Sequence, residues 1–321
     1  MEKKSLITKK GKDVKTEIGK EKKTGGRSYS RPSEVFVSNR GLEMIADLRK
    51  HFDDFHTLPE QFDKPLEMAL LNMELRNLTN PKRINFERGL VTFSPSSASK
   101  CERELFYKAL KMEKDEQLMF PYQKRWVRNG SAIHGAVQKD LLYAEKVLPN
   151  PTFTVDRMPD KTPAWEHNLK DVKQVDHNGI RFQIFGMMDG ILVYKDGTKV
   201  GFEFKTKSTT LGAIGEYKMK DAQDGHKEQC VAYSILFGVD EFMLTYESLA
   251  KDGWNKGEEA KNDMRPFYFK VTDADRNAML DKFARVAEMV KDAEIPSPDF
   301  EKCIFCPFKS RCHKDMMSAH E

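Results

Sequence analysis

The chain has 321 residues, of which 39% are hydrophobic, and a formal net charge of +4 at pH 7. That length can bury a sizeable core, best organised as one large domain with appendages. No stretch approaches the roughly 18 continuous apolar residues of a membrane span, and the N-terminus lacks the apolar segment of a signal peptide. We therefore expect no membrane partner and a soluble, cytoplasmic chain whose thiols stay reduced.

The positive charge is concentrated at the N-terminus. Residues 1–32 hold eleven Lys or Arg against four Asp or Glu, a surplus of seven positive charges. The remaining chain has a net charge near −3, so a nucleic-acid-binding surface has to be a local patch. Few large apolar residues accompany the N-terminal charges, and residues 1–33 are predicted to be a disordered basic tail.

Residues 34–85 are predicted to form a helical N-terminal extension. Its two helical patterns, Gly41 to Phe52 and Pro65 to Leu78, are joined by polar and Pro-containing segments. No residue in this extension indicates chemistry, so its role stays open. Two further helical patterns, Ser96 to Leu110 and Ser131 to Leu148, precede the segment that carries the chemistry.

A β-hairpin is predicted next. The apolar run 184–188 leads to Asp189 and a strand from Ile191 to Tyr194, and Lys195-Asp196-Gly197 turns the chain into a returning strand, Val200 to Lys205. A helix, two strands and a long C-terminal helix follow. They span Gln223 to Phe237, Glu241 to Glu247, Pro266 to Val271 and residues 273–292.

Three charged residues of the hairpin suit a metal site. Adjacent antiparallel strands can set Asp189 and Glu203 side by side, and Lys205 lies on the same face as Glu203. Two carboxylates beside one ammonium are the groups that hold a hard cation and hydrolyse a phosphodiester. The alternative is that Asp189 is a turn residue next to a solvated strand face. Apolar neighbours on both sides favour the metal site.

The cysteines predict a second metal centre. Cys303, Cys306 and Cys312 are too closely spaced for three independent core positions, and Cys-x-x-Cys presents two sulfurs to one centre. Three thiolates need a fourth ligand. Of the two remaining cysteines, Cys230 is interpreted as a small buried hydrophobe. The spacing alone permits zinc as well as an iron–sulfur cluster.

Six short motifs follow one another between about residues 90 and 315. They are Ser94 to Arg103 with Cys101, Gly130-Ser131-Ala132-Ile133-His134, Gly186-Met187-Met188-Asp189, Glu203-Phe204-Lys205, Gln229-Cys230-Val231-Ala232-Tyr233 and the terminal Cys-x-x-Cys with Cys312. In this order they resemble the PD-(D/E)XK nuclease superfamily. Within it, the pattern is similar to RecB-like exonucleases with an iron–sulfur cluster, of the AddB nuclease-domain and CRISPR-associated RecB-like type.

The resemblance implies a fold and a cluster. The fold would be α/β, a restriction-endonuclease-like core with a mixed central sheet flanked by helices and a C-terminal Cys-rich metal knot. Residues 86–321 would form this RecB-like nuclease domain. The resemblance adds Cys101 to Cys303, Cys306 and Cys312 as ligands of a structural [4Fe-4S] cluster, with zinc as the alternative occupant.

The resemblance also assigns catalytic roles. His134, Asp189, Glu203 and the main-chain carbonyl of Phe204 would hold Mg²⁺ or Mn²⁺. Lys205 would orient or deprotonate the attacking water and stabilise the transition state. Gln229 and Tyr233 share a helix face and would act beside the phosphate or the catalytic Lys. The alternatives are an ordinary surface or core histidine at position 134 and ordinary packing of the Gln–Tyr pair.

The predicted activity is that of a metal-dependent DNA exonuclease, processing DNA ends in recombination, repair or replication. Cations and aromatics alternate just before the His134 helix, a mixture that suits single-stranded DNA unless Trp126 belongs to the core. These residues are Tyr122, Lys124, Arg125, Trp126 and Arg128. The alternatives are a catalytically weak DNA-end-binding scaffold or a zinc-bound nucleic-acid-binding module. Without a Gly-rich Walker loop, unwinding would fall to a helicase or recombination partner.

Overall fold

The computed structural model describes residues 38–207 and 209–318. The predicted tail over residues 1–33 lies outside these ranges. Among the helices within them, none is both long and apolar enough to cross a membrane.

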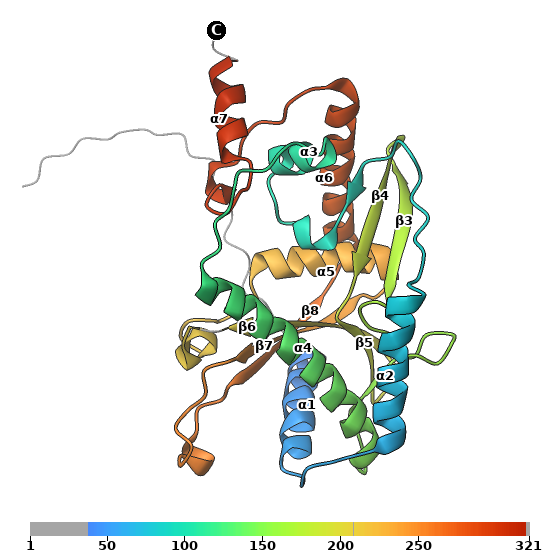
Figure 1. Ribbon diagram of the computed structural model, residues 1–321, viewed down its shortest axis with the longest axis vertical. Coiled ribbons are helices and arrows are strands. Elements are labelled where there is room, and N and C mark those ends of the chain that lie inside the picture. Colours follow the sequence, from blue (N-terminus) through green and yellow to red (C-terminus); the bar gives the residue numbers. More distant parts are fainter. Residues whose placement is uncertain (1–37, 208, 319–321) are drawn as a thin grey trace, which may run out of the picture. The chain divides into compact units, whose positions relative to one another are not determined.

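A five-stranded mixed sheet forms the centre of the fold (Figure 1). Its strands, in spatial order, are β2 (Phe153–Val155), β5 (Gly190–Tyr194), β6 (Lys199–Lys207), β7 (Glu241–Ser248) and β8 (Met264–Lys270). β6 and β7 run parallel, and the other neighbours are antiparallel. A parallel pair requires a crossover connection, and α5 (Asp224–Phe237) lies in that connection.

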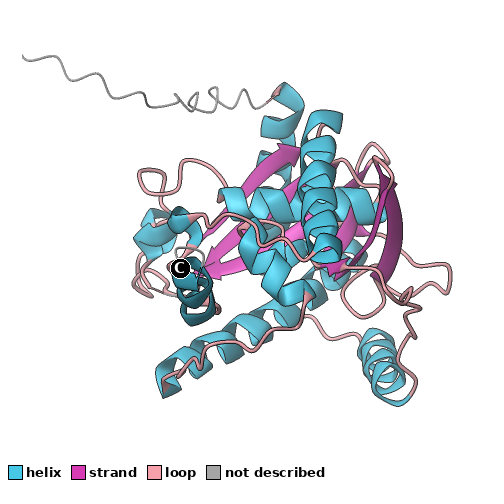
Figure 2. Cartoon of the chain, turned by 90° about the horizontal axis from the view of Figure 1, so that it is seen from above, coloured by secondary structure: helices cyan, strands magenta, loops and turns pink. Residues whose placement is uncertain are grey.

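Helices cover both faces of this sheet (Figure 2). On one face, α1 (Asn39–His56) and α4 (Pro121–Val147) share a core with Phe202 and Phe204 of β6. On the other face, α5 and α6 (Asp273–Asp292) share a core with Phe242 and Leu244 of β7. Successive side chains of a strand point to opposite faces, so Glu203, between the two phenylalanines of β6, points towards α5.

A second sheet has the order β1 (Thr92–Phe93), β4 (Ile180–Met187) and β3 (Lys170–His177). β3 and β4 form a hairpin whose turn residues, Asn178 and Gly179, have φ angles of 55° and 79°. Asn-Gly is a strong sequence signal for such a turn, because both positions need a left-handed backbone. β4 leads through Met188 and Asp189 into β5, so the candidate aspartate lies at the junction of the two sheets.

The predicted N-terminal extension contains α1 and α2 (Lys64–Thr79). Ser38 caps α1 by accepting a hydrogen bond from the main-chain N–H of Gly41. Met44, Leu48 and Phe52 of α1 are buried in the core of the sheet. α1 is therefore packed as part of the core of the central sheet, whereas α2 has no fully buried residue.

The C-terminal segment packs back on α3 (Glu102–Ala109), which follows a short 3₁₀ turn, Pro95–Ser97. The hydroxyl of Tyr107 on α3 donates a 2.8 Å hydrogen bond to Asp315 of α7 (Lys309–Ser318). The ring of Phe308 lies 5.6 Å from that of Tyr107, centroid to centroid. The segment that carries Cys101 and the segment that carries the other three predicted cysteine ligands are thereby brought together.

The predicted fold class, a mixed central sheet flanked by helices, is confirmed. Two helix boundaries were wrong. α4 begins at Pro121 rather than Ser131, so the Gly130-to-His134 motif lies in the middle of a helix and not at its start. The helix predicted from Ser96 begins at Glu102, after the 3₁₀ turn.

Candidate active site

The β5–β6 hairpin sets Asp189 opposite Glu203. Gly190 pairs with Phe202 in the antiparallel register, so the residue before Gly190 faces the residue after Phe202. Side chains in such positions have Cβ atoms about 4.5–5.5 Å apart. Asp189 Oδ2 accepts a 2.9 Å hydrogen bond from the main-chain N–H of Phe204. The structure thus brings the two predicted carboxylates together.

The Glu203 side chain is fully buried, and no donor in the described part of the chain has suitable hydrogen-bond geometry towards its carboxylate. Its exposure is 0%, and neither carboxylate oxygen has a hydrogen-bond partner among the described residues. The Lys205 ammonium lies within ion-pair distance of Oε1. Burial and the charge of Asp189 raise the pKa of Glu203 above the usual carboxyl range, and Lys205 offsets them only in part. A carboxylate in this environment is suited to a further cation.

Lys205 lies beside both carboxylates with 26% of its side chain exposed. Burial alone would lower the pKa of Lys205, but the charges of Glu203 and Asp189 outweigh burial and raise it. Lys205 is therefore an ammonium at neutral pH. In this state it can stabilise negative charge on a phosphate.

His134 reaches the same place from α4. Its Nδ1 atom lies 3.7 Å from Asp189 Oδ2. The helix can approach β6 closely because residue 130 is glycine: a Cβ there would lie 3.2 Å from Thr206 Oγ1. One turn after His134, the Gln138 amide donates a 3.0 Å hydrogen bond to the main-chain oxygen of Asp189. Residues four apart on a helix share a face, and this face of α4 lies against the site.

Gln229 and Tyr233 lie behind the carboxylates on α5. The Gln229 amide donates to the Tyr233 hydroxyl at 2.9 Å, and that hydroxyl donates to the main-chain oxygen of Met187 at 2.6 Å. Both side chains are buried. In this arrangement the pair fixes the chain two residues before Asp189, which is a positioning role.

Glu166 also lies at the site, although no sequence motif contains it. Ligand atoms of Glu166, His134 and Asp189 all lie within 4.8 Å of one another. Glu203 is not a member of this group, although it faces Asp189 on the neighbouring strand. Glu166 lies in an irregular segment between β2 and β3, and neither periodicity nor spacing distinguishes it from a surface glutamate.

The donor set of this site fits a divalent cation. Carboxylate oxygens are the ligands that Mg²⁺ and Mn²⁺ prefer, and one imidazole is compatible with Mn²⁺. His134, Asp189 and Glu166 have ligand atoms close enough to share one ion. The buried oxygens of Glu203 lack hydrogen bonds within the described chain. These observations support a metal-binding role for the residues that the sequence singled out.

The four predicted cluster ligands lie in two segments that pack against each other. Cys101 begins α3, where its sulfur accepts a 3.2 Å hydrogen bond from the main-chain N–H of Glu104. Burial, Cys101 and Cys312 raise the pKa of Cys303. Burial, Glu104 and the nearby Cys101 and Cys303 raise the pKa of Cys306 to about 11. All four thiols are free, and no three of their sulfurs lie within 4.8 Å of one another.

Cys230 lies elsewhere. It is fully buried on α5, within the apolar core. Burial and the charge of Glu203 raise its pKa, so its neighbours are active-site residues. This position agrees with its interpretation as a buried hydrophobe.

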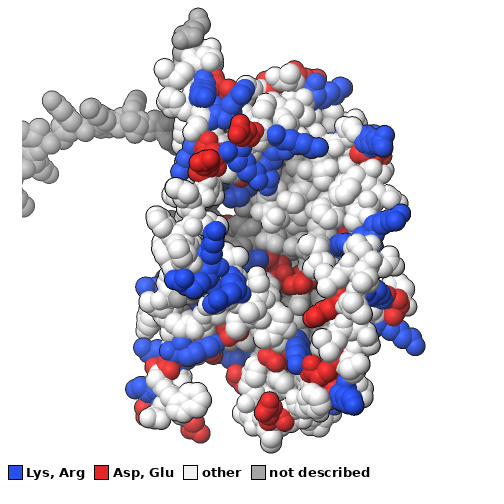
Figure 3. Space-filling model, viewed as in Figure 1, with Lys and Arg blue, Asp and Glu red and all other residues white. Residues whose placement is uncertain are grey.

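The basic and aromatic stretch forms the first turns of α4. Tyr122 and Trp126 are 48% and 45% exposed, so Trp126 is not a core residue. Their rings lie 5.3 Å apart, edge to face. Lys124, Arg125 and Arg128 are exposed on the same turns, and Figure 3 shows basic side chains gathered over this part of the surface.

The family comparison defines the class of protein. The model of the PD-(D/E)XK nuclease superfamily matches residues 104–313, more than half of the chain. The chain therefore belongs to the PD-(D/E)XK nuclease superfamily. No curated protein matches the sequence.

Two solved structures are similar to this chain at low identity. SSO0001 is 16% identical, and the match covers 85% of this chain and 97% of SSO0001 with a TM-score of 0.37. An alkaline exonuclease from Laribacter hongkongensis is 12% identical, and the match covers 64% of this chain and 90% of the exonuclease with a TM-score of 0.39. Both TM-scores lie below 0.5, so the family assignment rests on the match to residues 104–313.

Proposed function

We propose that this chain is a Mg²⁺- or Mn²⁺-dependent DNA exonuclease of the RecB-like branch. It would process DNA ends in recombination, repair or replication, in the cytoplasm. The observation that carries the proposal is Glu203, a fully buried carboxylate opposite Asp189 and paired with Lys205. A purely structural ion pair would leave Asp189 as a surplus negative charge, whereas a divalent cation serves both carboxylates.

The residues of the site have separate tasks. Asp189, Glu203 and His134 would hold the ion, with the carbonyl of Phe204 as a further donor. When bound, the ion supplies hydroxide at neutral pH and draws charge from the phosphate. Lys205, beside both carboxylates, would place a positive charge where the phosphate becomes more negative.

The substrate proposed is DNA with a single-stranded end. Tyr122, Trp126, Gly130 and His134 are each four residues apart on α4, so they follow one ridge of the helix. At 1.5 Å per residue, Trp126 lies about 12 Å along the axis from His134. Exposed aromatic rings can stack on unpaired bases while the neighbouring cations pair with phosphates. A strand lying on this ridge would lead directly to the metal site.

Trp126→Ala is expected to weaken binding of single-stranded DNA by about 5-fold to 100-fold, because one base loses its stacking partner. Binding of blunt duplex DNA and the Mn²⁺ affinity should stay unchanged. Fluorescence anisotropy with both DNA forms measures the difference. Phe62→Ala is the control, since Phe62 is 78% exposed and precedes α2. Equal affinities of the Trp126 variant and the wild type for single-stranded DNA would rule out this path.

The exonuclease activity is tested with end-labelled linear and closed circular single-stranded DNA of the same length, each with Mg²⁺ or Mn²⁺. We expect mononucleotides or short oligonucleotides from the linear form and persistence of the circle. Cleavage of the circle at the same rate would show an endonuclease. Tight binding to linear ends without any cleavage would favour the scaffold alternative.

We also propose that Cys101, Cys303, Cys306 and Cys312 hold a [4Fe-4S] cluster with a structural role, zinc being the alternative occupant. The packing of the Cys101 segment against the segment that carries the other three cysteines, and the soft sulfur donor set, support this proposal. The sequence contains no Walker loop, so a helicase or recombination partner would supply unwinding.

A further inference from the structure

We propose that Glu166 is a metal ligand of the active site, which contributes a carboxylate to the ion held by His134 and Asp189. This inference rests on the proposed metal-dependent function. It extends that function to a residue outside the six sequence motifs.

The first argument is the convergence of three ligand atoms. Glu166, His134 and Asp189 come from an irregular segment, a helix and a strand junction, and their ligand atoms lie within 4.8 Å of one another. Bonds from oxygen or nitrogen to such an ion are about 2.0–2.6 Å long. One ion between the three residues could therefore bond to all of them.

The second argument is the backbone around Glu166. The main-chain N–H of Ile191 donates to Ala164 at 2.9 Å, and that of Glu166 donates to Met188 at 2.7 Å. These two bonds join the segment to the chain on both sides of Asp189. The main chain, and not only a side-chain rotamer, thus fixes Glu166 beside Asp189.

The third argument is the conformation of Glu166 itself. Its φ angle is 38°, in the left-handed region that is unfavourable for a residue with a Cβ atom and that glycine or asparagine usually occupies. Unfavourable backbone conformations are frequent at functional sites, where the surrounding structure enforces them.

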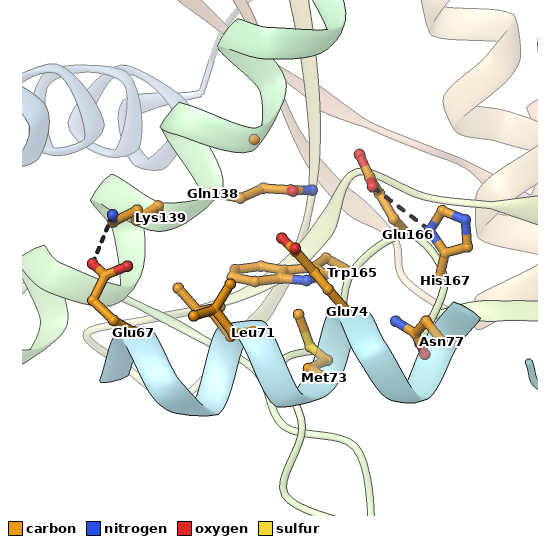
Figure 4. A pocket seen from close by; sticks show the side chains of 12 residues that line it. Glu67, Leu71, Met73, Glu74, Asn77, Gln138, Lys139, Trp165, Glu166 and His167 are labelled. Atoms are coloured by element: carbon orange, nitrogen blue, oxygen red, sulfur yellow. Dashed lines mark ion pairs between the residues drawn. The ribbon is translucent and has the colours of Figure 1, made fainter. Parts of the chain in front are cut away.

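The fourth argument is that the Glu166 carboxylate has a weak ion-pair contact. That contact, with His167 Nδ1, is 3.9 Å long and exists only if the imidazole is protonated. Figure 4 shows Glu166 across the pocket from α2, with Gln138 of α4 extending towards it. Because 37% of the Glu166 side chain is exposed, the carboxylate has room to turn towards an ion.

Glu203 is a second observation that favours a cation near Asp189. Its carboxylate is fully buried, its ion-pair partner among the described residues is Lys205, and it lies opposite Asp189 in the strand register. Asp189 therefore has Glu166 as a close neighbour and Glu203 on the adjacent strand, and the Lys205 ammonium pairs with Glu203. A divalent cation relieves the repulsion between these carboxylates. A merely solvated Glu166 would explain its exposure, but not the convergence of its ligand atom with those of His134 and Asp189.

The test is Mn²⁺ binding to the metal-free protein without DNA, measured by calorimetry and by electron paramagnetic resonance of free Mn²⁺. Glu166→Gln is expected to weaken Mn²⁺ binding by about tenfold or more, since removal of even an outer-shell partner costs 10-fold to 100-fold. Glu74→Gln is the matched control. Glu74 lines the same pocket but lies outside the ligand group, so its variant should bind Mn²⁺ like the wild type.

Glu166→Gly separates the side chain from the backbone. Glycine tolerates the left-handed conformation, so this variant should melt no earlier than the wild type without metal and should still lose Mn²⁺ affinity. Wild-type Mn²⁺ binding by both Glu166 variants would overturn the inference. If Asp189→Asn also bound Mn²⁺ like the wild type, the proposed metal-dependent function would be refuted together with the inference about Glu166. If Asp189→Asn alone lost Mn²⁺, that function would stand and only the role of Glu166 would be refuted.

Discussion

Glu203→Gln is expected to lower the rate of cleavage by a factor of at least about 10². Without metal, the variant should nevertheless be at least as stable as the wild type at alkaline pH. Glutamine keeps the shape of the side chain but gives up the anionic oxygens that the cation needs. The loss of activity should therefore appear without a loss of folding. Cleavage assays with Mn²⁺ and thermal denaturation in EDTA measure the two effects.

The pH dependence follows from the raised pKa of Glu203. Above the ordinary value of 4.5, the unfolded chain releases the proton that the folded chain still holds. The unfolded state then binds fewer protons, so the free energy of unfolding of the wild type falls as the pH rises. Glutamine does not ionise, so the free energy of unfolding of the variant should increase relative to that of the wild type from about pH 5 to about pH 9. A stability difference that moves in the opposite direction would contradict this assignment.

Cys101→Ala is expected to remove the cluster and to lower stability together, by an amount on the order of 2–5 kcal/mol. A metal centre joining Cys101 to Cys303 closes a loop of about 200 residues, whose closure restricts the unfolded chain. Part of the C-terminal segment should remain docked, because Tyr107 binds Asp315 independently of the cysteines. Iron and sulfide analysis of protein purified without air, with thermal denaturation, measures both losses.

Cys230→Ala is the matched control for the cluster. It should keep the iron and cost on the order of 1 kcal/mol for the small cavity left in the core. Loss of iron from this variant, with retention in Cys101→Ala, would refute the ligand set. One zinc and no iron in the wild type would change the occupant and leave the four ligands in place.

The hairpin of the active site could be predicted from the sequence because its signals are local. The turn at Lys195-Asp196-Gly197 and the alternation of β6 fix which residues share a face. That information is enough to place Glu203 beside Asp189. The positions of His134 and the cysteines followed from the resemblance, since no local pattern brings segments so far apart in sequence together.

The N-terminal half of α4 was missed because it lacks the pattern that indicates a helix. Nearly all residues from 121 to 129 are exposed, so no apolar stripe marks the period of the helix. Pro121 at its first turn was the available signal. β3 was missed for a related reason: it is an edge strand with many charged residues, and Asn178-Gly179 was its turn signal.

Glu166 shows the limit of motif-based inference. It lies in an irregular segment whose path depends on main-chain bonds to Met188 and Ile191, and these bonds form only once the sheet has folded. No spacing rule connects residue 166 to residues 134 and 189. Tertiary structure was needed to bring it into the site.

The most direct test of the metal-dependent nuclease site is the release of labelled nucleotides from linear single-stranded DNA by wild-type protein and by Asp189→Asn. Reactions contain Mn²⁺ or excess EDTA, and circular dichroism verifies that the variant is folded. The account predicts rapid release by the wild type with Mn²⁺, none in EDTA, and none by the folded variant under either condition. Release by the wild type in EDTA, or at the wild-type rate by Asp189→Asn with Mn²⁺, would contradict it.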